Sequence, residues 1–297
     1  MSGAITFTLD LEDHRPDESA ELRYPRVTRM VLEHLAGQGV TGTFFVVGIV
    51  AEAEPDLVRE VAAAGHEIGY HTWDHTPLVE RGEASLREDL RRGKGLLEDL
   101  AGDAVVGFRA PTFSLVESTT WATDVIADEG FTYSSSVLPA ANPLYGYPGA
   151  PLDPFLWPSG LAEFPSPLGG IGRFQIPYLG GTYLRLLPRP LISAAHRRAT
   201  SPVPWTYMHP YDVDPGERYW REPVAGVMAP LLWVGRRRVL TKLDHLLDGS
   251  GAAPHGVPLR DRIDEARAGG TYDPSTMTLT PTPTPNPTPP APNDEER

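Results

Sequence analysis

The sequence predicts a distorted (β/α) barrel of about seven strands, and three observations support this fold class. Over the first 135 residues, short apolar segments alternate with amphipathic segments of helical period, the pattern of parallel strands joined by right-handed crossovers. Polar side chains directly follow several apolar segments, as they do where strand ends surround one cleft. The length of 297 residues suits one large α/β domain.

The expected strands are short, and the one at 43–47 is apolar throughout, which is typical of a strand covered on both faces. They span residues 5–9, 43–47, 66–70, 105–108 and a segment starting at 131–133, with a later strand at 203–208. The helices between them carry apolar residues at three- and four-residue spacing. They span residues 24–38, 55–64, 83–100 and 118–129. Pro55 suits the first turn of its helix, and Gly39 and Gly65 follow helix ends.

The second half of the chain is less regular. Residues 136–190 are rich in Pro, Gly and aromatics, and they either wall a substrate groove or form an ordinary irregular insertion. Helices are expected at 225–248 and 259–268, which completes a catalytic domain spanning residues 1–270. Thr/Pro repeats dominate residues 271–297, and such a segment cannot bury enough apolar surface to fold, so we expect a disordered tail.

Composition excludes several classes of function. A net charge of −13 disfavours nucleic acid and anionic membrane surfaces as partners, because both attract basic proteins. The absence of cysteine excludes disulfides, thiolate metal sites and cysteine nucleophiles. No apolar run is long enough to span a membrane, and the start of the chain shows no signal peptide. These features predict a cytoplasmic protein, and they indicate no particular oligomeric state.

Two histidines four residues apart, His71 and His75, are the strongest chemical feature. Their rings can converge on one face of a helix or in a compact loop, and neutral imidazole is the commonest ligand for zinc-like metals. A third ligand is needed, and the end of the first strand offers Asp10, Glu12 and Asp13. Two histidines and a carboxylate suit zinc best, and cobalt, manganese, iron or nickel also fit.

Two further strand ends carry polar groups, at residues 107–111 and 207–211. Together these motifs resemble the NodB-homology polysaccharide deacetylases, also called carbohydrate esterase family 4. The segment Asp10–Asp13 resembles the first acidic motif of that family, and residues 71–75 match its H-[ST]-x-x-H metal motif. Residues 109–111 match its R-x-P motif, and residues 208–210 resemble its late histidine motif. Residues 133–139 and 180–188 resemble a subgroup associated with exopolysaccharide and exosortase loci.

The resemblance implies a metal-dependent removal of N-acetyl groups from N-acetylglucosamine-type sugars, in a polysaccharide or its precursor. It implies that Asp13, His71 and His75 hold one divalent metal, with Glu12 as the alternative to Asp13. Asp10 is then the general base paired with Arg109, and His209 is the general acid. Backbone N–H groups near residues 133–136 are expected to bind the oxyanion. Expected substrate contacts are Pro111, Tyr133, Ser135 and Tyr211.

The chain departs from the family pattern at the fourth motif, which has no clear match. Ser134 stands where the subgroup has an aspartate, and Glu163 becomes the candidate for orienting His209. Two alternatives follow from these departures. One is an allantoinase-like amidohydrolase acting on small non-peptide amides, favoured by a small closed pocket. The other is a non-catalytic glycan-binding relative.

Overall fold

The computed structural model describes residues 4–171, 174–220, 230–231, 233–248 and 256–282. Its main sheet has the strand order β1-β2-β3-β4-β5-β7-β6-β10-β11, and the pairs from β1 through β5 to β7 are parallel. The parallel strands are β1 (Phe7–Leu11), β2 (Gly42–Val46), β3 (Glu67–Tyr70), β4 (Gly107–Phe108), β5 (Tyr133–Ser134) and β7 (Ala162–Glu163). The remaining strands are β6 (Phe155–Leu156), β10 (Thr271–Asp273) and β11 (Thr278–Thr280).

The segment 203–208 closes the sheet into a barrel-like form, as the sequence predicts. It lies along the free edge of β1 through parallel bridges that pair Thr6 with Trp205 and Leu9 with Met208. The indole N–H of Trp205 donates a hydrogen bond of 3.1 Å to the carbonyl of Pro165, just beyond β7. The two sides of the sheet therefore meet through this segment, and the expected distorted (β/α) barrel is confirmed.

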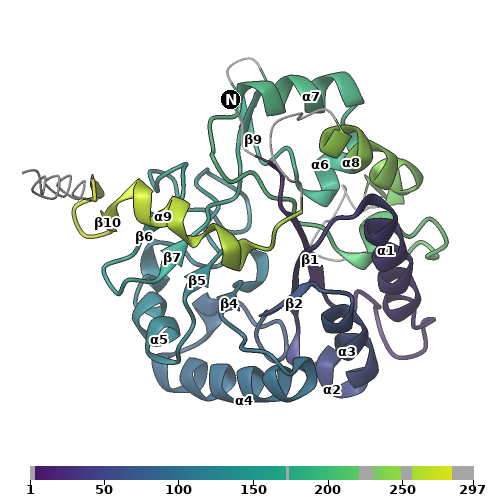
Figure 1. The fold of residues 1–297 in the computed structure, drawn as a ribbon, viewed down its shortest axis with the longest axis horizontal. Helices are drawn as coiled ribbons and strands as arrows, with labels where there is room; N and C mark the ends of the chain where they lie inside the picture. Colours follow the sequence, from purple (N-terminus) through teal and green to yellow (C-terminus); the bar gives the residue numbers. More distant parts are fainter. Residues whose placement is uncertain (1–3, 172–173, 221–229, 232, 249–255, 283–297) are drawn as a thin grey trace, which may run out of the picture.

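The first five helices form an arc outside strands β1 to β5 (Figure 1). They are α1 (Tyr24–Gln38), α2 (Gly48–Ala53), α3 (Pro55–Ala63), α4 (Glu83–Ala101) and α5 (Ala122–Asp128). Helix α1 shows why they pack there, because Val27, Val31 and Leu35 lie on one face and are buried in the main core. It ends at Gly39, whose φ of 66° is the left-handed conformation that glycine adopts without strain.

The second half of the chain contains more regular structure than its sequence indicates. The hairpin β8 (Gly169–Ile171) and β9 (Phe174–Ile176) is followed by α6 (Gly181–Leu186) and α7 (Arg189–Arg198). Figure 1 shows α6, α7 and α8 (Val239–Asp248) grouped together, away from β4 and β5. Residues 136–190 were expected to be irregular. That expectation missed α6, whose six residues are too few to establish a helical period.

The expected helix over residues 225–248 is wrong in its described part. Gly235 has a φ of 80°, and a short 3-10 turn at Arg236–Arg238 precedes α8. Because a left-handed residue cannot continue a right-handed helix, the helix begins only at Val239. Residues 225–229 and 232 lie outside the described residues. The expected helix near residue 259 is present as a 3-10 turn at Leu259–Arg262 and α9 (Ile263–Gly269).

The expectation of a disordered tail starting at residue 271 is also wrong for its first part. Strands β10 and β11 form an antiparallel pair that extends the main sheet. Tyr272 anchors them because its ring packs on Phe155, Trp157 and Tyr147 and is only 1% exposed. Residues 283–297 lie outside the described residues. Within the described ranges, no helix has the length and apolar character needed to cross a bilayer.

Candidate active site

The carboxyl ends of β1, β3, β4 and the segment 203–208 meet at one cleft of ≈ 330 Å³. This is the arrangement that the sequence predicts, with polar residues following successive strands. The ionisable groups that line the cleft are Asp10, Glu12, His71, His75, Arg109 and His209. Its walls include the aromatic side chains of Phe113, Tyr145, Tyr183, Tyr207 and Tyr211.

The two histidines after β3 converge in a loop and not on a helix face. Thr72 and His75 have φ values of 61° and 60°, in the left-handed region that non-glycine residues rarely adopt. The loop is held by the buried carboxylate of Asp89, which accepts hydrogen bonds from the hydroxyl of Tyr70 (2.9 Å) and the backbone N–H of Trp73 (3.0 Å). The strained turn brings the ring centroids of His71 and His75 to 5.0 Å.

The hydrogen bonding of His71 suits it to metal binding. Its Nδ1–H donates to the backbone carbonyl of Arg109 at 2.7 Å, and this fixes the lone pair on Nε2. Burial lowers the pKa of His71 to about 4. The ring is therefore neutral near pH 7, which is the form that ligates a metal.

The acid that joins the two histidines is Glu12. Its Oε2 lies 2.8 Å from Nε2 of His75, and one ligand atom each from Glu12, His71 and His75 lie within 4.8 Å of one another. Burial raises the pKa of Glu12, but the charges of His75 and His209 outweigh burial and hold it well below its usual value. Burial lowers the pKa of His75, but the Glu12 carboxylate outweighs this and raises it.

The expected place of Asp13 beside the histidines is wrong. Its carboxylate instead accepts hydrogen bonds from the backbone N–H of Arg15 at 3.0 Å and from the Arg15 guanidinium at 2.8 Å. The reason is strand geometry, because side chains alternate between the two faces of an extended chain. Asp10 at the end of β1 and Glu12 two residues later point into the cleft, and Asp13 points to the other side.

Asp10 and Arg109 form a buried ion pair at the floor of the cleft. Nη1 of Arg109 lies 2.6 Å from Oδ1 of Asp10, and the guanidinium stacks between the rings of Phe45 and Trp205, 4.0 and 4.3 Å from their centroids. The Nε of Arg109 also donates to the hydroxyl of Ser135 at 2.9 Å. The guanidinium is thus fixed on three sides, and it orients the Asp10 carboxylate.

The second oxygen of Asp10 faces the imidazoles. Oδ2 lies 3.9 Å from Nε2 of His71 and 3.8 Å from Nε2 of His209. These distances leave room for a small group between the carboxylate and the rings. Asp10, the paired histidines and His209 therefore surround one point in the cleft.

Asp212 orients His209. The Nδ1–H of His209 donates to Oδ2 of Asp212 at 3.0 Å, and Oδ1 of Asp212 lies 2.9 Å from Nε of Arg185. The ring of His209 also stacks on Tyr211, with centroids 4.7 Å apart. Burial lowers the pKa of His209, but the charge of Glu12 and then the hydrogen bond to Asp212 outweigh burial and raise it to about 9. His209 is therefore protonated near pH 7.

The prediction that Glu163 orients His209 is wrong. Glu163 is buried, and it accepts hydrogen bonds from the backbone N–H groups of Ser136 (2.7 Å) and Val137 (3.1 Å) and from the indole of Trp157 (3.1 Å). It therefore holds the chain after β5. Asp212 was overlooked, although its position three residues after His209 was a signal that could have identified it.

Three of the four expected substrate contacts lie beneath the cleft wall. Among the described residues, Tyr211 lines the cleft, whereas Pro111, Tyr133 and Ser135 are buried and are not part of its lining. The hydroxyl of Tyr133 donates to Glu67 at 2.8 Å. The backbone N–H groups of Ser135 and Ser136 donate to Phe108 and Glu163. The expected oxyanion donors are therefore engaged within the fold.

Residues 6–133, which carry the acidic, histidine and arginine motifs, match the family described as polysaccharide deacetylase. Residues 6–133 form a polysaccharide deacetylase domain of the NodB type. Residues 135–251, which supply Asp212 and His209, match a second family described as a domain of unknown function. Glu12, His71 and His75, which could hold a metal ion, thus lie within the deacetylase match. His209 and Asp212 lie within the second match.

Curated relatives of the deacetylase domain include a peptidoglycan-N-acetylglucosamine deacetylase from Bacillus cereus. It is 33% identical over 109 residues, which are 36% of this chain and 38% of that protein. A chitooligosaccharide deacetylase from Azorhizobium caulinodans is 35% identical over 89 residues, which are 30% of this chain and 42% of that protein. The chain thus spans less than half the length of these relatives.

Solved structures share the fold over most of the chain. A protein from Mycobacterium smegmatis described as a polysaccharide deacetylase has a TM-score of 0.64 at 21% identity, covering 97% of this chain and 95% of that one. A pseudoenzyme of the CE4 family from Bacillus anthracis has a TM-score of 0.51 at 12% identity, covering 89% of this chain and 66% of that one. Because a pseudoenzyme has this fold too, the fold alone does not establish activity, which depends on the residues in the cleft.

Proposed function

We propose that this protein is a metal-dependent hydrolase that removes N-acetyl groups from N-acetylglucosamine-type sugars, in a polysaccharide or its precursor. One observation carries the proposal: the donor atoms of Glu12, His71 and His75 converge beside a fixed carboxylate, Asp10, and a protonated imidazole, His209. A metal site, a general base and a general acid together can polarise the carbonyl of an unactivated amide, activate a water and protonate the leaving amine.

The residues fit a divalent metal. His71 is neutral with Nε2 as its acceptor, Glu12 is ionised, and His75 lies against Glu12. Two imidazoles and one carboxylate form the donor set of many catalytic zinc sites, and they leave a position open. Cobalt, manganese, iron and nickel accept the same donors. A metal held there supplies Lewis-acid polarisation of the acetamide carbonyl and lowers the pKa of a water.

Asp10 is the general base in this proposal. Arg109 fixes its Oδ1 at 2.6 Å, and its Oδ2 faces the imidazoles. A water between Oδ2 and the acetamide carbon gives its proton to that oxygen as it attacks. General-base catalysis by a positioned side chain typically raises a reaction rate by about 10²–10⁴-fold.

His209 is the general acid. An amine leaves slowly as an anion, so the sugar nitrogen needs a proton when its bond to the acyl carbon breaks. His209 is protonated near pH 7, and its Nε2 faces the same point as Asp10 from another strand end. Asp212 holds Nδ1 of the same ring, and so directs Nε2–H toward the leaving nitrogen. The products are acetate and a free amino sugar.

A second candidate is hydrolysis of small non-peptide amides of the allantoinase type. The cleft of ≈ 330 Å³ lies at the small end of the range for ligand pockets, and this favours a compact substrate. Both reactions use the same attack of water on an amide carbonyl and the same protonation of the leaving nitrogen. The two substrates differ in how far they extend past the aromatic walls of the cleft.

Two assays of the zinc-loaded full chain test the proposal: acetate release from N-acetylglucosamine oligomers and peptidoglycan fragments, and ring opening of allantoin. Both are repeated with the variants Asp10→Asn and His71→Ala. We expect acetate from an N-acetylated sugar, with a loss of about 10²-fold or more in Asp10→Asn. Turnover of allantoin alone supports the second candidate. Tight glycan binding without turnover, unchanged in His71→Ala, supports a non-catalytic glycan-binding protein and contradicts the proposal.

A further inference from the structure

A large basic pocket lies outside the catalytic cleft, between α6, the start of α7 and residues 233–242. Its volume is ≈ 960 Å³, which is enough for a drug-sized ligand. Its charged lining, within the described residues, consists of cations alone: Arg185, Arg189, Arg236, Arg237, Arg238 and Lys242. In a chain of net charge −13, this concentration of positive charge is a local property of the pocket.

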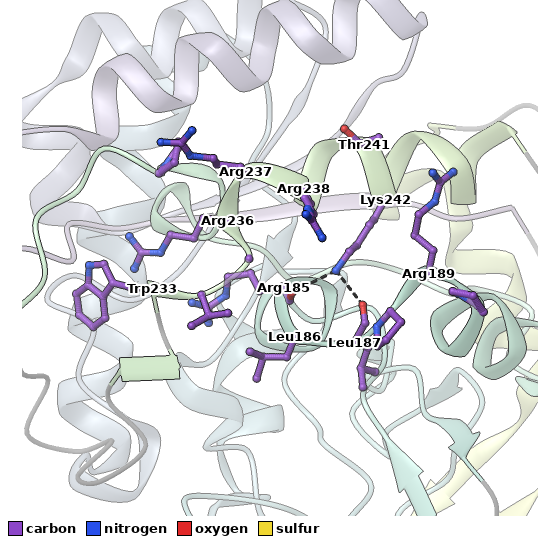
Figure 2. A pocket seen from close by; sticks show the side chains of 15 residues that line it. Arg185, Leu186, Leu187, Arg189, Trp233, Arg236, Arg237, Arg238, Thr241 and Lys242 are labelled. Atoms are coloured by element: carbon purple, nitrogen blue, oxygen red, sulfur yellow. Dashed lines mark hydrogen bonds between the residues drawn. The ribbon is translucent and has the colours of Figure 1, made fainter.

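Some of these cations maintain the pocket wall (Figure 2). The ammonium of Lys242 donates to the carbonyls of Leu184 (2.6 Å) and Leu187 (2.8 Å) at the C-terminal end of α6, where a cation satisfies carbonyls that have no helical partner. Arg236 lies 2.6 Å from Glu217, and Arg185 lies 2.9 Å from Asp212. These three side chains are buried, and Lys242 fixes α8 against the end of α6.

The other three cations are available to a ligand. Arg189, Arg237 and Arg238 are exposed, and no carboxylate in the part of the chain that the structure describes forms an ion pair with them. Figure 2 shows Arg189 at one end of the pocket, Arg237 toward the other and Arg238 between them. Burial and then the charge of Arg238 lower the pKa of Lys242, consistent with a positive potential here. Guanidinium groups match the oxygens of a phosphate.

The rest of the lining is mostly apolar, with Trp233 at one end (Figure 2). It includes Leu186, Leu187, Pro188, Pro190 and Val234. Leu186 and Val234 are 38% and 50% exposed, so apolar surface is open to a ligand beside the arginines. Thr241 is the one neutral hydroxyl among the described lining residues. A glycan would need several such groups to satisfy its hydroxyls.

We propose that the basic pocket binds one lipid phosphate, with the phosphate or diphosphate on Arg189, Arg237 and Arg238 and the start of its apolar chain along Leu186 and Val234. The concave shape suits a single amphiphile, whereas a bilayer surface is flat and anionic and is opposed by the net charge of −13. The proposal is independent of the proposed deacetylation, because the three exposed arginines are not part of the cleft lining.

Calorimetric titration of the full chain with farnesyl diphosphate below its micelle concentration tests this site. We expect farnesyl diphosphate to bind at least about tenfold more tightly than inorganic diphosphate or farnesol. The double variant Arg237→Glu/Arg238→Glu should lose at least about tenfold in affinity for farnesyl diphosphate. A matched control is Arg59→Glu/Arg267→Glu, because both residues are exposed and neither lines the pocket. It should bind like the unaltered chain.

A second variant, Leu186→Asn, tests the contribution of the lipid's apolar chain separately from that of its phosphate. It should weaken farnesyl diphosphate and leave inorganic diphosphate unchanged, with circular dichroism confirming that each variant folds. Equal affinity for inorganic and farnesyl diphosphate would mean an adventitious ion only, and would overturn the proposal. So would binding to phosphatidylcholine vesicles containing about 20 mol% phosphatidylglycerol without binding to the monomeric lipid. Equal loss in the double variant and its matched control would also overturn it.

Discussion

The Nδ1–H of His209 donates a hydrogen bond to Oδ2 of Asp212, three residues later, at 3.0 Å. The same carboxylate lies 2.9 Å from Arg185 through Oδ1. The ring is therefore fixed from the side opposite the cleft, and its Nε2 is the atom that faces Asp10. In the proposed reaction, Asp212 is thus a positioning residue that acts only through His209.

Replacing Asp212 with Asn should shift the pH dependence of deacetylation. Burial lowers the pKa of His209, but the charge of Glu12 and then the bond to Asp212 raise it to about 9, so removing the charge of Asp212 lowers that pKa. Because the acid form of His209 is then lost at lower pH, the basic limb of kcat/KM should move down by about one pH unit. Asp214→Asn, which removes a carboxylate that pairs with Arg23, is the matched control. A loss of rate with an unmoved basic limb would contradict the role of Asp212.

Replacing Arg109 with Leu should destabilise the fold as well as the reaction. The change leaves Asp10 buried without its ion-pair partner, and breaking such a buried pair costs about 3 kcal/mol in the free energy of unfolding. Arg59→Leu removes an exposed pair with Asp56 and should cost less than about 1 kcal/mol. Urea denaturation of both variants measures the difference. Equal costs would mean that Asp10 and Arg109 are not coupled in the folded protein.

Glu67 should make stability depend on pH. Burial raises its pKa from 4.5 to about 7, so the folded chain binds more protons than the unfolded chain between these values. The free energy of unfolding therefore falls as pH rises through this window, by about 3 kcal/mol in total. Glu67→Gln should remove this fall, and Glu60→Gln, at an exposed position, should retain it. An unchanged fall in Glu67→Gln would assign the effect to another group.

The sequence predicted the parallel strands and first helices because their patterns are local. The range 24–38 was predicted for α1 and is observed, since its apolar spacing and the following Gly39 are both local features of the sequence. The long helix at 225–248 failed because apolar spacing does not reveal the left-handed Gly235. The tail was misjudged at Tyr272 because its burial depends on aromatic residues more than one hundred positions earlier.

Motifs alone identified the proposed catalytic groups, but the residues that hydrogen-bond to them were less predictable. The choice between Glu12 and Asp13 was decidable in principle, because alternation places Glu12 on the same face as Asp10. The bond from Asp212 to His209 was also local. Glu163 was misassigned because its partners, from Ser136 to Trp157, depend on how β5 and β7 pair. The basic pocket joins α6 to α8 across the chain, and no local pattern indicates it.

Metal binding by Glu12→Gln and Asp13→Asn, measured by zinc titration of metal-free protein, tests the central claim most directly. Both changes remove one charge from neighbouring positions, and only Glu12 lies with His71 and His75. We predict that the unaltered chain and Asp13→Asn bind one zinc ion with similar affinity, and that Glu12→Gln binds at least about tenfold more weakly. Loss of zinc in Asp13→Asn with full binding in Glu12→Gln would contradict this account of the site.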